Sequence, residues 1–195
     1  MYKHYCEMIL SVDDSVGQVM KALLERGFAH NTVVLFTSDG GHLWGEHGLI
    51  DKRCAYEESI RIPLLVSCPA LIRPGEKCDA IVSNIDVAPT LLELAGVPHP
   101  EAMDGLSFAR LLEQPSTKQL GRDTFLYEYY WEPNYPHTPT MHALRGKRYK
   151  YIRYHGVWDI NELYDLQADP HETRNLIDRD EHQDLVRQLN RRLFE

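Results

Sequence analysis

The chain has 195 residues, of which 29 are acidic and 21 basic, so its formal net charge is −8 with histidine counted as neutral. This acidic balance argues against nucleic acid as a partner, because phosphate binding needs an excess of lysine and arginine. Hydrophobic residues make up 43% and charged residues 26%, which excludes a largely disordered chain. No apolar stretch approaches the ~20 residues that a membrane-spanning helix needs, so we expect no membrane span.

The first part of the chain predicts one helix and two strands. Apolar residues recur at spacings of four and three from Tyr5 to Leu23, which predicts an amphipathic helix that ends near Gly27. Residues 32–37 form a short run that is mostly β-branched and apolar, and residues 62–67 form a second run of this kind. Such unbroken runs are typical of strands buried on both faces of a parallel sheet.

Helices and strands continue to alternate further along the chain. One or two helical turns are expected over residues 55–59, and a third, short strand over residues 81–82. Asp86 is expected to cap a helix over residues 87–95. This alternation of strand and helix predicts an α/β fold.

The pattern changes after Leu112, and residues 114–116 are a plausible boundary. Three prolines enforce a loop over residues 131–139, and apolar residues at helical spacing predict a terminal helix after Asp180. Segments that alternate or are rich in aromatic residues predict three antiparallel strands, at 125–130, 142–145 and 149–154.

A candidate binding site lies at the end of the first predicted strand. Asp39 follows that strand and precedes Gly40 and Gly41, and ligands of open α/β sheets bind at the carboxyl ends of strands. A carboxylate at this place suits a hard cation, whereas a turn aspartate that binds nearby backbone is the alternative, and spacing alone leaves both open. The basic pair Lys52 and Arg53 lies on the same loop, so acid and base are expected to converge.

Several motifs on and around this loop occur in a fixed order: TSDGGHLWGEHG at 37–48, DKR at 51–53, YE at 56–57, RIPLLV at 61–66 and NIDVAPTLL at 84–92. Together they resemble the carboxy-terminal half of a type I sulfatase, in the alkaline phosphatase superfamily. The segments at 143–152 and 162–172 are similar to the small terminal subdomain of that family. The resemblance therefore covers nearly the whole chain.

The resemblance implies an α/β fold in two parts. Residues 1–115 would form the carboxy-terminal part of the catalytic domain, which is part of an alkaline-phosphatase-like mixed sheet with flanking helices. Residues 116–195 would form a small antiparallel α+β subdomain, a sheet with a terminal helix. Members of this family are commonly exported, so the resemblance would allow a periplasmic, secreted or lysosomal protein. The 195 residues carry no recognisable export signal, and the compartment stays open.

The resemblance further implies hydrolysis of sulfate esters with a divalent metal, calcium or a similar ion, and a formylglycine nucleophile made from cysteine or serine. Asp39 matches the carboxylate metal ligand of the family on this loop, and Lys52 matches the lysine that contacts the sulfate group. Gly40 departs from the pattern, because the family usually has asparagine or histidine there as a further contact. A cation and lysines suit this chemistry because they neutralise charge on the sulfuryl oxygens.

The nucleophile motif of the family, cysteine or serine followed by x-P-x-R, does not occur among the 195 residues. The aspartate pair that completes the metal site of the family is also missing, because Asp13 and Asp14 lie on the opening predicted helix. We therefore expect a carboxy-terminal fragment that is inactive alone. Its partner would be the missing amino-terminal half of the same domain, which would carry the formylglycine and the other metal ligands.

Three further side chains are weaker candidates for substrate binding: His42, Arg53 and His142. His42 on a loop is more often a surface or packing residue, and Arg53 has the alternative of an ion pair with Glu57 or Glu58. The resemblance would allow His142, at the start of a predicted strand, to contact substrate from the terminal subdomain. A zinc site is disfavoured, because the histidine spacing on the loop matches none of the usual zinc patterns.

Two segments in the second half have both a functional and a plain interpretation. The aromatic loop at 129–139 could form a wall for a sugar ring, or it could be a proline-stiffened connection whose aromatics pack on the sheet. The basic side chains of Arg145, Lys147, Arg148 and Lys150 alternate with other residues, which predicts the solvated side of a strand.

The sequence thus favours a sulfatase that acts on a sulfated small molecule, a sugar or a glycan. The weak preference for sulfated amino sugars rests on the resemblance of residues 50–57. Two alternatives stay open. The first is a non-catalytic module that binds sulfated glycan or a partner subunit. The second is a phosphodiesterase or phosphonate hydrolase of the same superfamily, since phosphoryl and sulfuryl groups share their shape.

Overall fold

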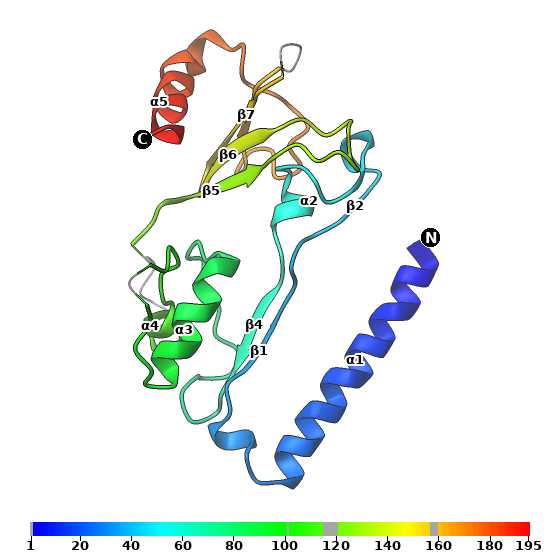
Figure 1. The fold of residues 1–195 in the computed structure, drawn as a ribbon, viewed down its shortest axis with the longest axis vertical. Coiled ribbons are helices and arrows are strands. Elements are labelled where there is room, and N and C mark those ends of the chain that lie inside the picture. Colours follow the sequence, from blue (N-terminus) through cyan, green and yellow to red (C-terminus); the bar gives the residue numbers. More distant parts are fainter. Residues whose placement is uncertain (1, 101, 115–120, 157–159) are drawn as a thin grey trace.

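The computed structural model describes residues 2–100, 102–114, 121–156 and 160–195 (Figure 1). It begins with helix α1 (Tyr2–Glu25), which confirms the expected helix and lies beside the rest of the molecule. Gly27 follows the helix with a φ of 74°, a conformation that glycine adopts without strain. No residue of α1 is buried, and apolar side chains such as Ile9 and Val19 are about half exposed.

A short 3₁₀ turn, η1 (Ala29–Asn31), leads into strand β1 (Val34–Thr37), which pairs with β4 (Leu64–Ser67). Both strands were expected, but the prediction of parallel, doubly buried strands is wrong for this pair. The pairing is antiparallel, and Leu65 is 65% exposed. An unbroken apolar run carries no information on whether its strand pairs parallel or antiparallel. Within the described residues, β1 and β4 form a sheet of two strands with no further strand beside them.

The connection between β1 and β4 carries a small hairpin and a single helical turn. Strands β2 (Leu43–Trp44) and β3 (Ile50–Asp51) pair antiparallel around the 3₁₀ turn η2 (Glu46–Gly48). Helix α2 (Glu57–Ile60) follows and confirms the expected helical turn. The start of β4 pairs with the end of β1, and β4 begins four residues after α2 ends. Both ends of the connection therefore lie close to the end of β1.

The segment after β4 differs from the prediction in two respects. No strand forms at residues 81–82, and the chain enters the 3₁₀ turn η3 (Asn84–Asp86), helix α3 (Val87–Leu94) and helix α4 (Ala109–Glu113). The Asp86 side chain does not cap α3. It accepts hydrogen bonds from the backbone N–H groups of Ser83 (2.8 Å) and Leu106 (2.7 Å), because it closes η3 and ties the later loop to it.

The second half forms one antiparallel sheet in the order β5-β6-β7-β8, which confirms the three expected strands and adds a fourth. Its strands are β5 (Thr124–Tyr129), β6 (Met141–Gly146), β7 (Tyr149–Tyr154) and β8 (Glu162–Asp165). The 3₁₀ turn η4 (Asp180–His182) and helix α5 (Gln183–Leu193) follow, as expected. No helix within the described ranges is long and apolar enough to cross a membrane.

The two faces of this sheet cover different parts of the chain. One face packs against Leu43 and residues 54–56 and so meets the connection between β1 and β4. The opposite face packs against α5 (Figure 1). Pro115 and Ser116, where a boundary was expected, lie outside the described residues, and the division at 115 stays a prediction.

Candidate functional site

The loop between β1 and α2 brings Asp39 and Lys52 into contact. The Lys52 ammonium Nζ donates to Asp39 Oδ2 at 2.7 Å, across thirteen positions of sequence. The Asp39 side chain is 84% exposed and that of Lys52 39%, so both face open space. The expected convergence of acid and base is therefore present as an accessible ion pair.

The β2–β3 hairpin positions Lys52. Asp51 ends the hairpin with a φ of 92°, a left-handed conformation that side chains rarely adopt, and its carboxylate accepts the Lys52 N–H at 2.8 Å. Glu46 accepts the Trp44 N–H at 2.6 Å and so closes the turn at the other end. Lys52 thus leaves the hairpin at a fixed point beside Asp39.

Helix α2 holds this loop by its backbone. The N–H of Gly41 donates to Ser59 O at 2.7 Å, and the N–H of His42 donates to Glu58 O at 2.8 Å. The Ser59 hydroxyl donates to Lys52 O. A Cβ atom at Gly41 would lie 1.9 Å from Glu58 O, so this approach requires glycine.

The ion pair keeps the carboxyl group of Asp39 ionised. The hydrogen bond and the charge of Lys52 hold the pKa of Asp39 below its usual range. An ionised carboxylate is the form that binds a hard cation.

A pocket of about 1260 Å³ opens beside the pair. Its wall includes side chains of both charges and several aromatic rings: Asp39, Lys52, Arg53, Arg145, Tyr127, Tyr129 and Glu132. The pocket therefore lies between the loop and the first strand of the antiparallel sheet. Three of the candidates predicted from sequence, Asp39, Lys52 and Arg53, share it.

Arg53 is held by partners that the sequence did not suggest. Its guanidinium pairs with Asp51 and lies 3.5 Å from Glu132, and the ring of Tyr135 is stacked 3.2 Å from it. The alternative pairing with Glu57 or Glu58 is not what the structure shows. The proline-rich loop is thereby fastened to the pocket through Glu132 and Tyr135.

The two histidine candidates lie outside the pocket lining. The ring of His42 packs on Trp44, with centroids 4.5 Å apart. His142 stands between Glu128, at 3.1 Å, and His155, whose Nε2 lies 2.7 Å from its Nδ1. Since Glu128 does line the pocket, His142 meets it only through that carboxylate.

Sequence reasoning missed a buried group of charged residues behind the pocket. Lys150 was expected on the solvated side of its strand, yet it is 0% exposed and lies 2.8 Å from Glu57 and 2.7 Å from Glu172. Arg145 binds Glu57 through two nitrogens, at 2.9 and 3.3 Å. The solvated-face prediction is wrong for Lys150 because residues 54–57 cover that face of β6 and β7. Glu57 lies 88 positions from Arg145 and 93 from Lys150, so no local pattern reports these contacts.

Glu57 carries a pH dependence that can be measured. Burial alone would raise the pKa of its carboxyl, but the Arg145 hydrogen bond and the Lys150 charge outweigh burial and lower the pKa to about 2. A depressed carboxyl pKa stabilises the fold above the unfolded value of about 4.5, and this contribution is lost as pH falls toward 2.

We therefore expect Glu57→Gln to destabilise the protein at pH 7, by about 3 kcal/mol from the loss of the ionised carboxylate alone. The difference from the unchanged protein should shrink as pH falls from about 5 to 2. Urea unfolding across that range measures it. A difference that is independent of pH would contradict the assigned pKa.

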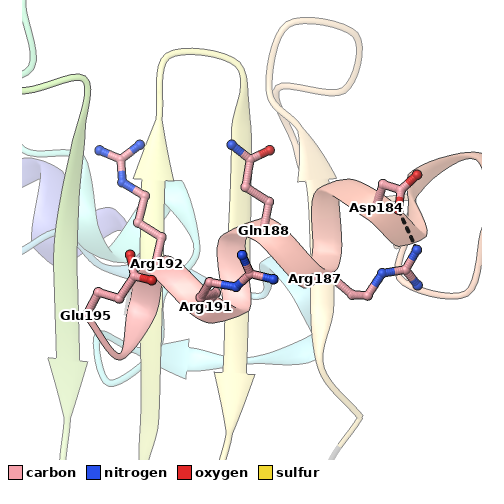
Figure 2. Close-up of a pocket in the computed structure, with 6 residues that line it drawn as sticks. All are labelled: Asp184, Arg187, Gln188, Arg191, Arg192 and Glu195. Atoms are coloured by element: carbon pink, nitrogen blue, oxygen red, sulfur yellow. Dashed lines mark hydrogen bonds and ion pairs between the residues drawn. The ribbon is translucent and has the colours of Figure 1, made fainter.

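A second hollow, of about 440 Å³, lies on α5 (Figure 2). Arg187, Arg191 and Arg192 line it together with acidic neighbours, and Arg187 is paired with Asp184. Helix α5 covers the sheet face opposite to the one that meets residues 54–56. This hollow is therefore separate from the Asp39–Lys52 site.

A protein-family model described as N-sulphoglucosamine sulphohydrolase, C-terminal, matches residues 45–195. The chain belongs to the sulfatase family. It is 34% identical over 194 residues to an N-acetylglucosamine-6-O-sulfatase of Bacteroides thetaiotaomicron. The aligned region covers 99% of this chain and 35% of that relative. The chain thus spans about a third of the length of the curated relatives it matches.

Solved structures place the sulfatase chain in the alkaline phosphatase-like fold. A structure of a relative in complex with its substrate D-glucosamine-2-N,6-O-disulfate superposes with a TM-score of 0.88 and 34% identity, over 95% of this chain and 38% of that one. The phosphonate monoester hydrolase of Agrobacterium radiobacter superposes with a TM-score of 0.81 and 25% identity, over 96% and 39%. The expected fold class is confirmed.

The donor set can be compared with what a divalent cation needs. Asp39 offers an exposed, ionised carboxylate with a cationic ammonium at Oδ2, which shows that positive charge is stable there. Among the described residues, the group of ligating side chains close enough to share an ion is His47, Glu58 and Glu172, which does not include Asp39. Asp39 therefore fits a metal as one ligand of a larger set.

Proposed function

We propose that the protein containing this chain hydrolyses sulfate esters of sulfated sugars, and that the chain supplies Asp39 and Lys52 to the reaction site. The observation that carries this proposal is the exposed ion pair of these two residues at the edge of a pocket, in a chain of the sulfatase family. Lys52 would neutralise charge that builds on the sulfuryl oxygens, and Asp39 would hold the cation.

The chain supplies only part of this chemistry. A divalent metal, calcium or a similar ion by the family resemblance, would supply charge stabilisation when bound, and formylglycine would supply the nucleophile. Asp39 is the residue here that would bind the metal, while Lys52 would turn from Asp39 to the sulfate group. We propose that an amino-terminal portion of the same domain supplies the nucleophile and the remaining ligands.

The substrate proposal is a sulfated amino sugar or a glycan that contains one. Relatives named for N-acetylglucosamine 6-sulfate support it, as does the relative solved with a glucosamine disulfate. The pocket offers Arg53 for an anionic group, and the rings of Tyr127 and Tyr129 for the apolar face of a sugar. His142 would act on the substrate only through Glu128, its neighbour at the pocket wall.

A phosphonate or phosphate diester hydrolase is the second candidate, because the structural likeness to a phosphonate monoester hydrolase is also high. The two candidates share the anion site and differ in the charge of the group transferred. The nature of the nucleophile would separate them.

The test begins with the coding DNA directly upstream of Met1, read in frame for an aspartate pair and for cysteine or serine followed by x-P-x-R. Sulfate release from glucosamine 6-sulfate by the complete protein would then support the proposal. Release of phosphonate ester products alone would favour the second candidate. A stop codon and promoter upstream, with no such motif, would favour a module that binds sulfated glycan without catalysis.

Gly40 gives a prediction about the metal. A Cβ atom at this position would lie 3.0 Å from Cδ of Lys52, the flexible part of a side chain that can move aside. Gly40→Asn adds a carbonyl oxygen next to Asp39, and we expect Ca²⁺ to bind the complete protein about tenfold more tightly. Calorimetric titration with CaCl₂ measures the change.

The matched control is Gly17→Asn, since nothing lies within 4 Å of a Cβ atom there. It should leave Ca²⁺ affinity unchanged. Equal affinities for the unchanged protein and Gly40→Asn would remove Gly40 from the metal site.

A further inference from the structure

Four buried or half-buried charged side chains connect the antiparallel sheet to helix α2. They are Glu57 on α2, Arg145 on β6, Lys150 on β7 and Glu172 in the loop after β8. Two cations face two carboxylates, so their charges balance. The side chains of Lys150 and Glu172 are fully shielded from solvent, and their charged atoms lie 2.7 Å apart. We call these four residues the charge network.

The charge network holds the amino end of α2. Tyr56 precedes the helix and offers no side-chain cap, and Glu172 takes that role from another part of the chain. Its Oε2 accepts the N–H of Glu57 at 2.7 Å. Lys150 donates to Ala55 O at 2.8 Å, so a residue of the sheet and a residue of the following loop together bind an acceptor and a donor at the start of α2.

Glu172 reaches this position at a conformational cost. Its φ is 51°, in the left-handed region that residues other than glycine rarely occupy. Such backbone strain persists only where surrounding contacts enforce it. The contacts to Glu57 and Lys150 contribute to this, together with the local turn in which the Glu172 N–H donates to Asp169 O at 3.2 Å.

The carboxyl end of the same helix holds the ion pair. Ser59 accepts the N–H of Gly41 through its carbonyl and donates its hydroxyl to Lys52 O. Glu57 and Ser59 are two positions apart in a helix of four residues, so a shift of one moves the other. The chain of contacts therefore runs from Glu172 through α2 to Lys52.

We propose that Glu172 is a positioning residue, which sets the place of Lys52 and Asp39 by fixing α2 against the sheet. Buried ion pairs contribute little net stability compared with apolar replacements. The role proposed for the charge network is therefore to fix the geometry of α2. The expected change in kcat rests on the proposed sulfate ester hydrolysis. The expected change in the position of α2 and of residues 39–60 does not depend on it.

The experiment compares Glu172→Ala and Glu172→Gln in the complete protein. The control is Asp86→Asn, since Asp86 is likewise fully buried, accepts two backbone N–H groups and pairs with a cation, yet these partners, Ser83, Leu106 and Arg122, belong neither to α2 nor to the loop that carries Asp39 and Lys52. All three variants should lower the denaturation midpoint.

We expect Glu172→Ala to lower kcat by roughly tenfold or more, with KM changed less than about twofold, because a displaced Lys52 weakens the transition state more than the bound substrate. Glu172→Gln should recover part of kcat, since the amide oxygen still accepts the Glu57 N–H. Asp86→Asn should leave kcat per folded molecule unchanged. Equal kinetic effects of Asp86→Asn and Glu172→Ala would reduce Glu172 to a purely structural role.

Amide hydrogen exchange supplies a readout that needs no turnover. Glu172→Ala should accelerate exchange in residues 39–60, and Asp86→Asn should leave that segment unchanged. If the unchanged protein hydrolyses no sulfate ester, the proposed function fails, and the exchange result alone decides the positioning role. Unaltered exchange at 39–60 in Glu172→Ala would overturn it.

Discussion

Replacing Asp39 with alanine is expected to abolish metal-dependent sulfate release by the complete protein, with a loss of roughly 10³-fold or more. The carboxylate is exposed and ionised, and we propose it as the ligand that this loop offers to a divalent cation. Without it, the stabilising charge beside the sulfuryl group would be lost or misplaced. Sulfate release, measured over a range of Ca²⁺ concentrations, tests the prediction.

The fold should survive this substitution, because the Asp39 side chain is 84% exposed and its ion pair lies at the surface. Thermal unfolding should therefore show little change. Asp178→Ala, which removes another exposed carboxylate, is the control and should keep full activity. Undiminished turnover by Asp39→Ala would refute the assignment of Asp39 to the metal.

Replacing Lys52 with alanine is expected to lower kcat by about 100-fold or more, because the proposed charge-assisted contact to the sulfuryl oxygens would be removed. Added Ca²⁺ should not restore the loss, which separates this variant from Asp39→Ala. Lys52→Arg should retain part of the activity, since the guanidinium group keeps the positive charge but differs in shape from the ammonium group. Steady-state kinetics of the complete protein gives all three results.

Lys21→Ala is the matched control, because Lys21 is an exposed lysine on α1, with only a loose ion pair to Glu25. It should match the unchanged protein in kcat and KM. A Lys52→Ala variant with unchanged kcat and raised KM would mean that Lys52 binds the substrate without acting on the transition state.

Elements with a strong local pattern were predictable from sequence. The helix over α1 and the three strands β5, β6 and β7 each carry a regular apolar or aromatic period, and the structure confirms them. The contact of Asp39 with Lys52 was also predictable in outline, because both residues lie on the same loop after the first predicted strand.

Features that depend on distant partners were not predictable. Strand direction in the β1–β4 pair has no local signal, and the prediction of a parallel sheet failed there. Lys150 alternates like a solvent-facing residue, and its burial depends on Glu57 and Glu172, 93 and 22 positions away. Asp86 has a sequence context typical of a helix cap, yet its oxygens are taken by Ser83, Leu106 and Arg122.

The two neighbouring glycines of the site loop differ in how freely they can change. Any side chain at position 41 would collide with the carbonyl oxygen of Glu58, which is backbone and cannot rotate away. A side chain at position 40 meets only the flexible stem of Lys52. Random variation of this loop should therefore leave Gly41 invariant among folded proteins while position 40 diversifies. Of these two positions, position 40 is therefore the one at which evolution could alter metal preference, and it lies next to the carboxylate that we propose as the metal ligand.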